Sequence, residues 1–322
     1  MSGNKSALIT GITGQDGSYM AELLINKDYT VVGVLQNNED SNMLLPSLRN
    51  QVNLHQWNML DQQGIIEVLR AFKIDEIYNF AAYSSGSGMY DDPVGIGEIN
   101  GIGVARILEA IRVVDKSIKL CQASSSEMFG EPTESPQSEE TRFSPRSPYG
   151  AAKLYAHSMV RIYRQRYGIF ACSAILYNHE SPRRGLGFVT RKITHEAVKI
   201  KLGLSNELKL GNLDSRRDWG FAGDYVNAIW LMLQNSVADD YIVATGELHS
   251  VREFCEFTFN YLGLDYHNYV KVDPELARPS ESVPLLGNSE KASKILGWRP
   301  SVKFNDLVKM MVDEEIKHFN GR

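Results

Sequence analysis

The sequence predicts an α/β protein with a doubly wound parallel sheet and a smaller C-terminal region. Two observations support this fold class. Short aliphatic runs alternate with longer helical patterns through the first half of the chain, which is typical of βαβ units. The first aliphatic run also leads directly into three glycines at regular spacing, Gly11, Gly14 and Gly17.

Strands are expected where β-branched and aliphatic residues cluster, at Ala7–Thr10, Thr30–Leu35, Val52–Trp57, Glu76–Phe80, Ile118–Gln122 and Phe170–Leu176. Helices are expected where apolar residues recur with helical spacing, at Tyr19–Asn26, Gln62–Phe72, Ile102–Val114, after Pro148, and at Val251–Leu262 and Phe304–Phe319. Strands become fewer after about Asn178. We therefore expect the sheet and the catalytic residues mainly in residues 1–178 and a smaller region in residues 179–322, with the chain free to cross between the two and a ligand cleft between them.

Composition excludes several classes of protein. The net charge of -5 without a dense Lys/Arg stripe argues against nucleic acid as a partner. No apolar run reaches the roughly 18 residues that a membrane span needs, and the N-terminus has no signal-type segment. The three cysteines are widely spaced and suggest no zinc site. We expect a metal-free protein of the cytoplasm, with its thiols buried and reduced.

The glycines predict a dinucleotide site of the Rossmann type. The first glycine allows a tight turn, the second lets the backbone approach a pyrophosphate, and the third lets the following helix pack on the strand. That helix would direct its N–H groups at the phosphates. The stretch after the second strand begins Gln36-Asn37-Asn38. It has neither the acidic residue at its start that grips a ribose hydroxyl nor an arginine for a 2′-phosphate, so NAD and NADP both stay open.

A catalytic group is expected downstream. Tyr149 and Lys153 share one helical face at i, i+4 spacing, and the ammonium should lower the tyrosine pKa towards neutrality. Ser125 follows the fifth strand and can hydrogen-bond a reacting hydroxyl. Glu127 can act as a base beside a redox centre. The plainer alternatives are a helix surface for the Tyr/Lys pair, a polar loop for Ser125, and a cap or surface ion pair for Glu127.

Together these residues resemble the extended short-chain dehydrogenase/reductases, and within them the GDP-mannose 4,6-dehydratase family. The resemblance runs nearly end to end. It is carried by Gly11–Tyr19, Ser124–Glu127, Pro145–Tyr149, Asn178–Gly185, Val189–Thr194, Gly211–Asp214, Arg216–Gly220, Ala244–Glu247 and His249–Glu253.

The resemblance implies an NAD(P)-dependent lyase acting on a GDP-hexose, most simply GDP-D-mannose. Tyr149 would take the proton of the sugar 4-hydroxyl while the hydride passes from C4 to the cofactor. Glu127 would take the C5 proton and expel water from C6, and the hydride would return to C6. The product would be a GDP-4-keto-6-deoxy sugar. NADP is the implied cofactor, with NAD possible, and a homodimer or homotetramer is the implied assembly.

The resemblance also implies a set of binding residues. Those assigned to the cofactor are Gly11, Thr13, Gly14, Gln15, Asp16, Gly17, Gln36, Asn58, Met59, Ala81, Ala82, Tyr83, Tyr149, Lys153, Leu176, Asn178, His179 and Arg184. Those assigned to the GDP-hexose are Ser125, Glu127, Asn178, Val189, Lys192, Gly211, Arg217, Arg278 and Glu281. Residues 179–322 would therefore mainly bind the nucleotide sugar.

Four positions depart from the family pattern. Ser125 replaces the usual threonine and keeps the hydroxyl. Gln36 begins a loop where the family has Arg-Arg-Ser-Ser, which bears on both the choice of NADP and subunit contacts. Asn58 replaces an aspartate at the adenine, and the segment 81–89 departs from the family beside the cofactor and sugar. A reductase or epimerase of a 4-keto nucleotide sugar is the alternative enzyme; it would not need Glu127. A cofactor-sensing regulator would not need a Tyr/Lys pair.

Overall fold

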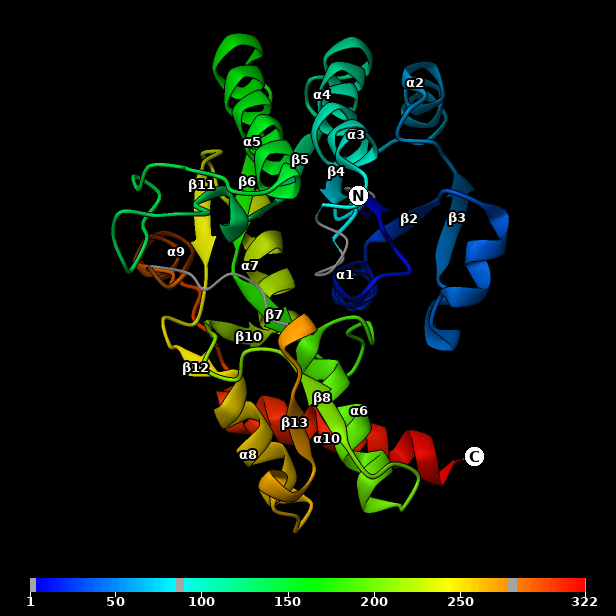
Figure 1. Cartoon of the computed structure of the whole chain (residues 1–322). Coiled ribbons are helices and arrows are strands. Elements are labelled where there is room, and N and C mark those ends of the chain that lie inside the picture. Colours follow the sequence, from blue (N-terminus) through cyan, green and yellow to red (C-terminus); the bar gives the residue numbers. More distant parts are fainter. Residues whose placement is uncertain (1–3, 85–89, 277–282, 322) are drawn as a thin grey trace.

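The computed structural model describes residues 4–84, 90–276 and 283–321. At its centre is a seven-stranded sheet in the order β11-β6-β5-β4-β1-β2-β3, in which every neighbouring pair is parallel (Figure 1). The strands are β1 Ser6–Thr10, β2 Thr30–Leu35, β3 Val52–Gln56, β4 Glu76–Asn79, β5 Lys119–Ser125, β6 Ala171–Leu176 and β11 Asp240–Val243. The predicted fold class is confirmed.

Two hydrophobic layers cover the sheet. On one face pack α2 (Gln62–Ala71), α4 (Gly103–Val114) and α5 (Pro148–Tyr167). On the other face pack α1 (Gln15–Ile25) and α7 (Ala222–Gln234). Because both faces are buried, β1, β2 and β6 are mostly apolar and appear in the sequence as aliphatic runs, whereas β4 and β5 also carry buried polar residues such as Asn79 and Gln122.

Some elements differ from the sequence predictions. Helix α1 begins at Gln15, four residues before the predicted start, because Gly17 packs inside its first turns instead of ending a loop. Strand β5 continues to Ser125 and so carries the predicted catalytic serine on regular structure. The short helix α3 (Pro93–Ile96) and a π-helical turn, η3 (Gly97–Ile102), precede α4 and were not predicted.

The C-terminal region packs around a core of its own, formed largely by α6, α8 and α10. Its elements are β7 Asn178–Glu180, α6 Val189–Lys201, β8 Leu208–Leu210, β9 Arg216–Arg217, β10 Trp219–Phe221, β12 His249–Ser250, α8 Val251–Tyr261, β13 Val270–Val272 and α10 Phe304–Asn320, whereas α9 Glu290–Leu296 packs against α7 and β11 of the main sheet. Three two-stranded sheets connect it: β7 with β10, β8 with β13, and β9 with β12. Between them the chain returns to the main sheet to add α7 and β11, so residues on both sides of the expected boundary at 178 build that sheet (Figure 1).

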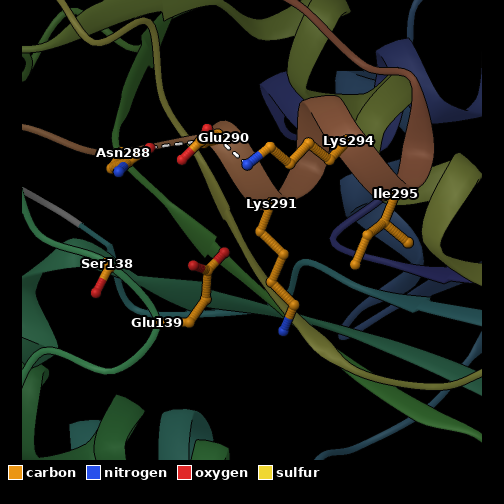
Figure 2. Close-up of a pocket in the computed structure, with 7 residues that line it drawn as sticks. All are labelled: Ser138, Glu139, Asn288, Glu290, Lys291, Lys294 and Ile295. Atoms are coloured by element: carbon orange, nitrogen blue, oxygen red, sulfur yellow. Dashed lines mark hydrogen bonds and ion pairs between the residues drawn. The ribbon is translucent and has the colours of Figure 1, made fainter.

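Two cavities lie outside the predicted catalytic group. One of about 270 Å³ lies beside α9 and is lined by Ser138, Glu139, Asn288, Glu290, Lys291, Lys294 and Ile295 (Figure 2). It contains none of the predicted site residues. The other, of about 470 Å³, is lined by Leu35, Ser41, Leu54, His55 and Gln56 at the ends of β2 and β3. Among the described residues, no helix is both long and apolar enough to cross a bilayer.

Candidate active site

The glycine turn closes tightly between β1 and α1. The Gly14 N–H donates to the Gly11 carbonyl at 3.0 Å. A Cβ atom added to Gly17 would lie only 2.2 Å from that same carbonyl oxygen, so α1 can pack this closely only with glycine there. The positive end of the α1 dipole therefore lies at the turn, as the predicted phosphate site requires.

The first turn of α1 is bound to the segment around β7. The Asp16 carboxylate lies 2.9 Å from His179 Nε2, and His179 Nδ1 lies 2.8 Å from the Tyr177 carbonyl oxygen. Both ring nitrogens thus face acceptors, which fits a protonated imidazole. Burial acts against that charge, but Asp16 raises the pKa of His179 above its ordinary value. Ser181 Oγ donates to Gln15 Oε1 at 2.8 Å. Predicted cofactor residues far apart in sequence therefore lie together.

Two arginines extend this contact. Arg183 donates to both carboxylate oxygens of Glu22 on α1, at 2.7 and 2.8 Å. Arg184 pairs with the buried Glu180 at 3.1 Å, and its charge acts on both Asp16 and Tyr149. The predicted cofactor residue Arg184 is therefore close enough to act electrostatically on both Asp16 of α1 and the predicted catalytic residue Tyr149.

Tyr149 and Lys153 lie on the first two turns of α5. Pro148 is the first helical residue, and Ser147 caps the helix by accepting the Gly150 N–H at 3.0 Å. The Lys153 Nζ atom lies 5.6 Å from the centre of the Tyr149 ring. It is buried and donates to the Ala123 carbonyl of β5 at 2.8 Å. The predicted pair therefore shares one helical face at the carboxyl end of the sheet.

The prediction that Lys153 brings the phenol pKa towards neutrality is wrong. Burial raises the pKa of Tyr149 to about 12, against a lowering contribution from its hydrogen bond with Ser125, and the charge of Glu127 raises it further. Burial also lowers the pKa of Lys153 to about 8. The phenol therefore keeps its proton at pH 7, because desolvation of the phenolate is the largest influence on its pKa.

Ser125 and Glu127 lie against this pair. Ser125 accepts the Glu127 N–H at 3.2 Å and so begins the short helix η4 (Ser126–Met128). A Cβ atom on Gly150 would lie 2.5 Å from the Glu127 carbonyl oxygen, so glycine lets the start of α5 approach this turn. The four predicted catalytic residues therefore converge at the carboxyl end of β5.

A chain of buried polar side chains supports Lys153 and was not predicted from the sequence. Thr10 Oγ1 donates to Asn79 Oδ1 at 2.6 Å, and Asn79 Nδ2 donates to Gln122 Oε1 at 2.6 Å. Gln122 Nε2 then donates at 2.8 Å to the Ala123 carbonyl that also accepts from Lys153. The polar chain Thr10–Asn79–Gln122 thus connects β1, β4 and β5. Its only signal in the sequence was a polar residue near the end of each apolar strand.

The loop after β4 is held by Thr10 of this polar chain and by a second buried side chain, Asn100. The Ala81 N–H donates to Thr10 Oγ1 at 2.9 Å. The buried Asn100, which was also not predicted, accepts the Tyr83 N–H at 2.8 Å and donates to the Tyr83 carbonyl at 3.0 Å. Predicted cofactor residues Ala81, Ala82 and Tyr83 are therefore fixed beside the glycine turn, whereas the rest of that departing segment, residues 85–89, lies outside the described residues.

The remaining predicted cofactor residues lie at strand ends. Gln36 directly follows β2, and Asn58 follows β3 and accepts the Leu60 N–H at 2.9 Å. Met59 and Leu176 are buried. Asn178 begins β7, immediately after the end of β6. All of these positions are at the carboxyl edge of the parallel sheet, where open α/β sheets bind ligands.

The predicted sugar-nucleotide residues lie mainly in the C-terminal region. Val189 starts α6 and is 37% exposed. Lys192 donates to a backbone carbonyl of β8 at 2.7 Å, and Gly211 directly follows that strand. Arg217 lies on β9, and its guanidinium donates to the neighbouring backbone carbonyl at 2.7 Å. Arg278 and Glu281 lie outside the described residues.

The residues present fit a nicotinamide dinucleotide. The turn approaches α1 so closely that a side chain at position 17 is excluded, which leaves backbone at the helix N-terminus for a pyrophosphate. In the part of the chain that the structure describes, the buried Ser124 hydroxyl has no hydrogen-bond partner. An unsatisfied hydroxyl at the end of β5 is expected where a polar ligand completes the site.

Comparison with known proteins gives matches over nearly the whole chain. The family model described as GDP-mannose 4,6 dehydratase matches residues 8–311. GDP-mannose 4,6 dehydratase 2 from Arabidopsis thaliana is 48% identical over 326 residues, covering 97% of this chain and 87% of the relative.

Solved structures at lower identity share the fold. The dTDP-glucose 4,6-dehydratase of Bacillus anthracis in complex with NAD matches with a TM-score of 0.86 at 20% identity, covering 98% of each chain. RMD from Pseudomonas aeruginosa complexed with NADPH matches with a TM-score of 0.83 at 21% identity, covering 98% of this chain and 100% of the other. These matches confirm the Rossmann-type architecture.

Proposed function

The chain belongs to the GDP-mannose 4,6-dehydratase family, and from this premise we propose that it dehydrates GDP-D-mannose to a GDP-4-keto-6-deoxy sugar. The observation that best supports this activity is the meeting of Tyr149, Lys153, Ser125 and Glu127 beside the glycine turn. The reaction needs one base for the 4-hydroxyl proton and a second base for the C5 proton of the same hexose, and Tyr149 and Glu127 can supply them.

Each residue has one task in this reaction. Tyr149 first loses its phenolic proton to solvent; the phenolate oxygen then takes the proton of the sugar 4-hydroxyl, and Ser125 hydrogen-bonds the same sugar oxygen. The buried ammonium of Lys153 stabilises negative charge as it develops on the phenol. A bound nicotinamide dinucleotide, held by the glycine turn, would supply a reversible hydride acceptor for this reaction.

Glu127 performs the elimination. Its carboxylate removes the C5 proton, which the neighbouring 4-ketone has made acidic, and the carboxylic acid so formed gives that proton to the departing C6 hydroxyl, which leaves as water. A proton returns to C5 as the hydride reaches C6, so the balance is loss of one water with no net oxidation. The partly buried position of Glu127 beside Tyr149 suits a base that acts on the next carbon of the ring.

The binding residues follow the predicted division. The glycine turn would hold the pyrophosphate, with Asp16, His179 and Arg184 beside it. Val189, Lys192, Gly211 and Arg217 would hold the GDP moiety, since basic side chains give the strongest bonds to a diphosphate. The proposal includes a homodimer or homotetramer and a cytoplasmic location, where the three buried free cysteines would stay reduced.

The decisive test replaces the base. We expect Glu127→Gln to lower kcat for dehydration by about 10²- to 10⁴-fold, because an amide cannot take the C5 proton. Binding of the dinucleotide should persist, and deuterium from solvent should no longer appear at C5. The matched control is Glu131→Gln, an exposed carboxylate four residues on, which should keep the wild-type rate. Dehydration at the wild-type rate in Glu127→Gln would remove this residue from the mechanism.

Mass spectrometry of the wild-type reaction separates the alternatives. Loss of one water from GDP-mannose supports the dehydratase. A product of unchanged mass with altered stereochemistry would indicate an epimerase. A gain of two hydrogens, dependent on added reduced cofactor, would indicate a reductase. Either of the last two outcomes would overturn the proposed activity.

A further inference from the structure

The loop after β2 bears on which dinucleotide this chain prefers. We infer that the loop makes the chain bind NAD more tightly than NADP, with Gln36, Asn37 and Asp40 as the determinants. This deepens the proposed function and rests on it in one respect only, that the chain binds a nicotinamide dinucleotide. The two cofactors differ by a single 2′-phosphate on the adenosine ribose, and in Rossmann folds the residues just after the second strand meet that position.

The loop is fixed by local contacts. Gln56 at the end of β3 donates to the Gln36 backbone carbonyl at 3.1 Å, so the first loop residue stays beside the sheet. The side chains of Gln36 and Asn37 are both exposed. Two neutral amides are therefore presented at the place where a 2′-substituent is read. An amide oxygen can accept a hydrogen bond from a ribose hydroxyl but offers no charge to a phosphate.

The charge of the loop opposes a phosphate. Between Leu35 and Ser41 the sequence contains two acidic residues and no lysine or arginine. The Asp40 carboxylate accepts the Asn37 N–H at 3.1 Å, as part of a capping box that begins the short helix η1 (Asn38–Met43). A backbone donor at this position is thus already bonded to an internal anion. A phosphate arriving there would meet a like charge instead of a free donor.

Two basic side chains on neighbouring segments of the fold have other partners. Arg49 donates to the carbonyls of Leu44 and Asn42 at the far end of η1, at 3.4 and 3.2 Å. The His55 ring packs edge-on against Phe72, with the ring centres 5.5 Å apart. Tight NADP binding requires charge-assisted bonds to its phosphate. Neither the loop nor these neighbours supplies them in the described part of the chain.

Binding titrations test the inference without the sugar substrate. We expect wild-type protein, stripped of nucleotide and titrated with NAD and with NADP by calorimetry, to bind NAD about tenfold or more tightly. Gln36→Arg adds a guanidinium at the ribose edge, so it should raise NADP affinity by about tenfold and shift the ratio towards NADP. Asp40→Asn keeps an oxygen for the cap but removes the charge, so it should raise NADP affinity by a smaller factor, about threefold.

The matched control is Asn53→Arg. Asn53 is an exposed residue of β3 that pairs with Val32, three residues before the end of β2. The Asn53→Arg substitution adds the same charge about 10 Å from the loop, which is roughly a Debye length at 0.1 M salt. It should leave the ratio of the two affinities within about twofold of wild type.

Each outcome is decisive for this inference. Equal or tighter NADP binding by the wild type overturns it, as does a Gln36→Arg ratio equal to that of Asn53→Arg. Preference for NAD in a protein that does not dehydrate GDP-mannose would leave the inference standing and remove the proposed function. Failure to bind either dinucleotide would remove both.

Discussion

The two ends of the proposed dinucleotide site are built in different ways. At the catalytic end, Lys153, Gln122 and Asn79 are at most 3% exposed, and their bonds connect separate strands of the sheet. At the ribose end, Gln36 and Asn58 are exposed, and the Asn58 side chain bonds only two residues away. The first end is fixed by the whole fold, whereas the second depends on a few exposed residues. The chemistry should therefore resist change, while cofactor choice can change without refolding.

The largest effect is expected from Tyr149→Phe at the catalytic end. Removing the phenolic hydroxyl takes away the group that accepts the 4-hydroxyl proton, so kcat should fall by about 10³-fold or more. Dinucleotide affinity should change little. A substrate deuterated at C4 gives the measurement, because its label appears at C6 only after hydride transfer. Label migration at the wild-type rate would contradict the assignment of Tyr149.

A smaller effect is expected from Gln122→Leu. This change leaves the buried Asn79 amide without its acceptor and removes one of the donors to the Ala123 carbonyl. Unsatisfied buried polar groups cost about 1–3 kcal/mol each, so the free energy of unfolding should fall by about 2–4 kcal/mol in urea titrations.

The matched substitution at the exposed ribose end of the site is Asn58→Ala. It should change the free energy of unfolding by less than about 0.5 kcal/mol. Equal losses in Gln122→Leu and Asn58→Ala would show that the two ends of the site contribute alike to stability. That result would remove the contrast between them.

A further effect is expected from pH. Because burial lowers the pKa of Lys153 to about 8, its ammonium is lost as the pH rises through that value. If the ammonium is needed, kcat/KM of the wild type should fall about tenfold for each pH unit above 8 relative to that of Lys153→Arg, in which Tyr149 titrates alike but the positive charge persists. Lys153→Arg should lack this decline, whatever its absolute rate, since arginine keeps its proton. An unchanged decline in Lys153→Arg would assign it to another group.

If Lys153 is the group that titrates, the fall in kcat/KM above pH 8 cannot be caused by unfolding of the protein. In the unfolded chain a lysine has a pKa of about 10.4. Between about pH 8 and pH 10.4 the unfolded state therefore binds more protons than the folded state. The contribution of Lys153 to the free energy of unfolding therefore rises with pH in this window. Circular dichroism at each pH, recorded beside the rate, checks that the fold is retained.

Local patterns made much of the site predictable. The glycines at 11, 14 and 17 and the pair Tyr149 and Lys153 each lie within a few residues of one another, so their spacing alone carries the geometry. The alternation of aliphatic runs and helices likewise predicts the parallel sheet. The predicted start of α1, at Tyr19, is four residues later than the observed start at Gln15. The prediction is wrong there because glycine usually marks a turn and seldom lies inside a helix.

The support beneath Lys153 could not be predicted in this way. Asn79 bonds Gln122 across 43 residues and Thr10 across 69, so these contacts depend on the order of the strands in the sheet. The raised pKa of Tyr149 has the same origin, because the burial of its phenol depends on residues from several elements. Spacing within one helix indicates which groups can meet, but not how dry their surroundings are.

The position of β11 has a consequence for synthesis of the protein on the ribosome. This strand, Asp240–Val243, pairs with β6, which is complete at Leu176. While the intervening residues are translated, β6 remains an open edge next to β5, ready to pair with another nascent chain. Shielding of newly made chains by chaperones should therefore matter most during this interval, before the last strand closes the sheet.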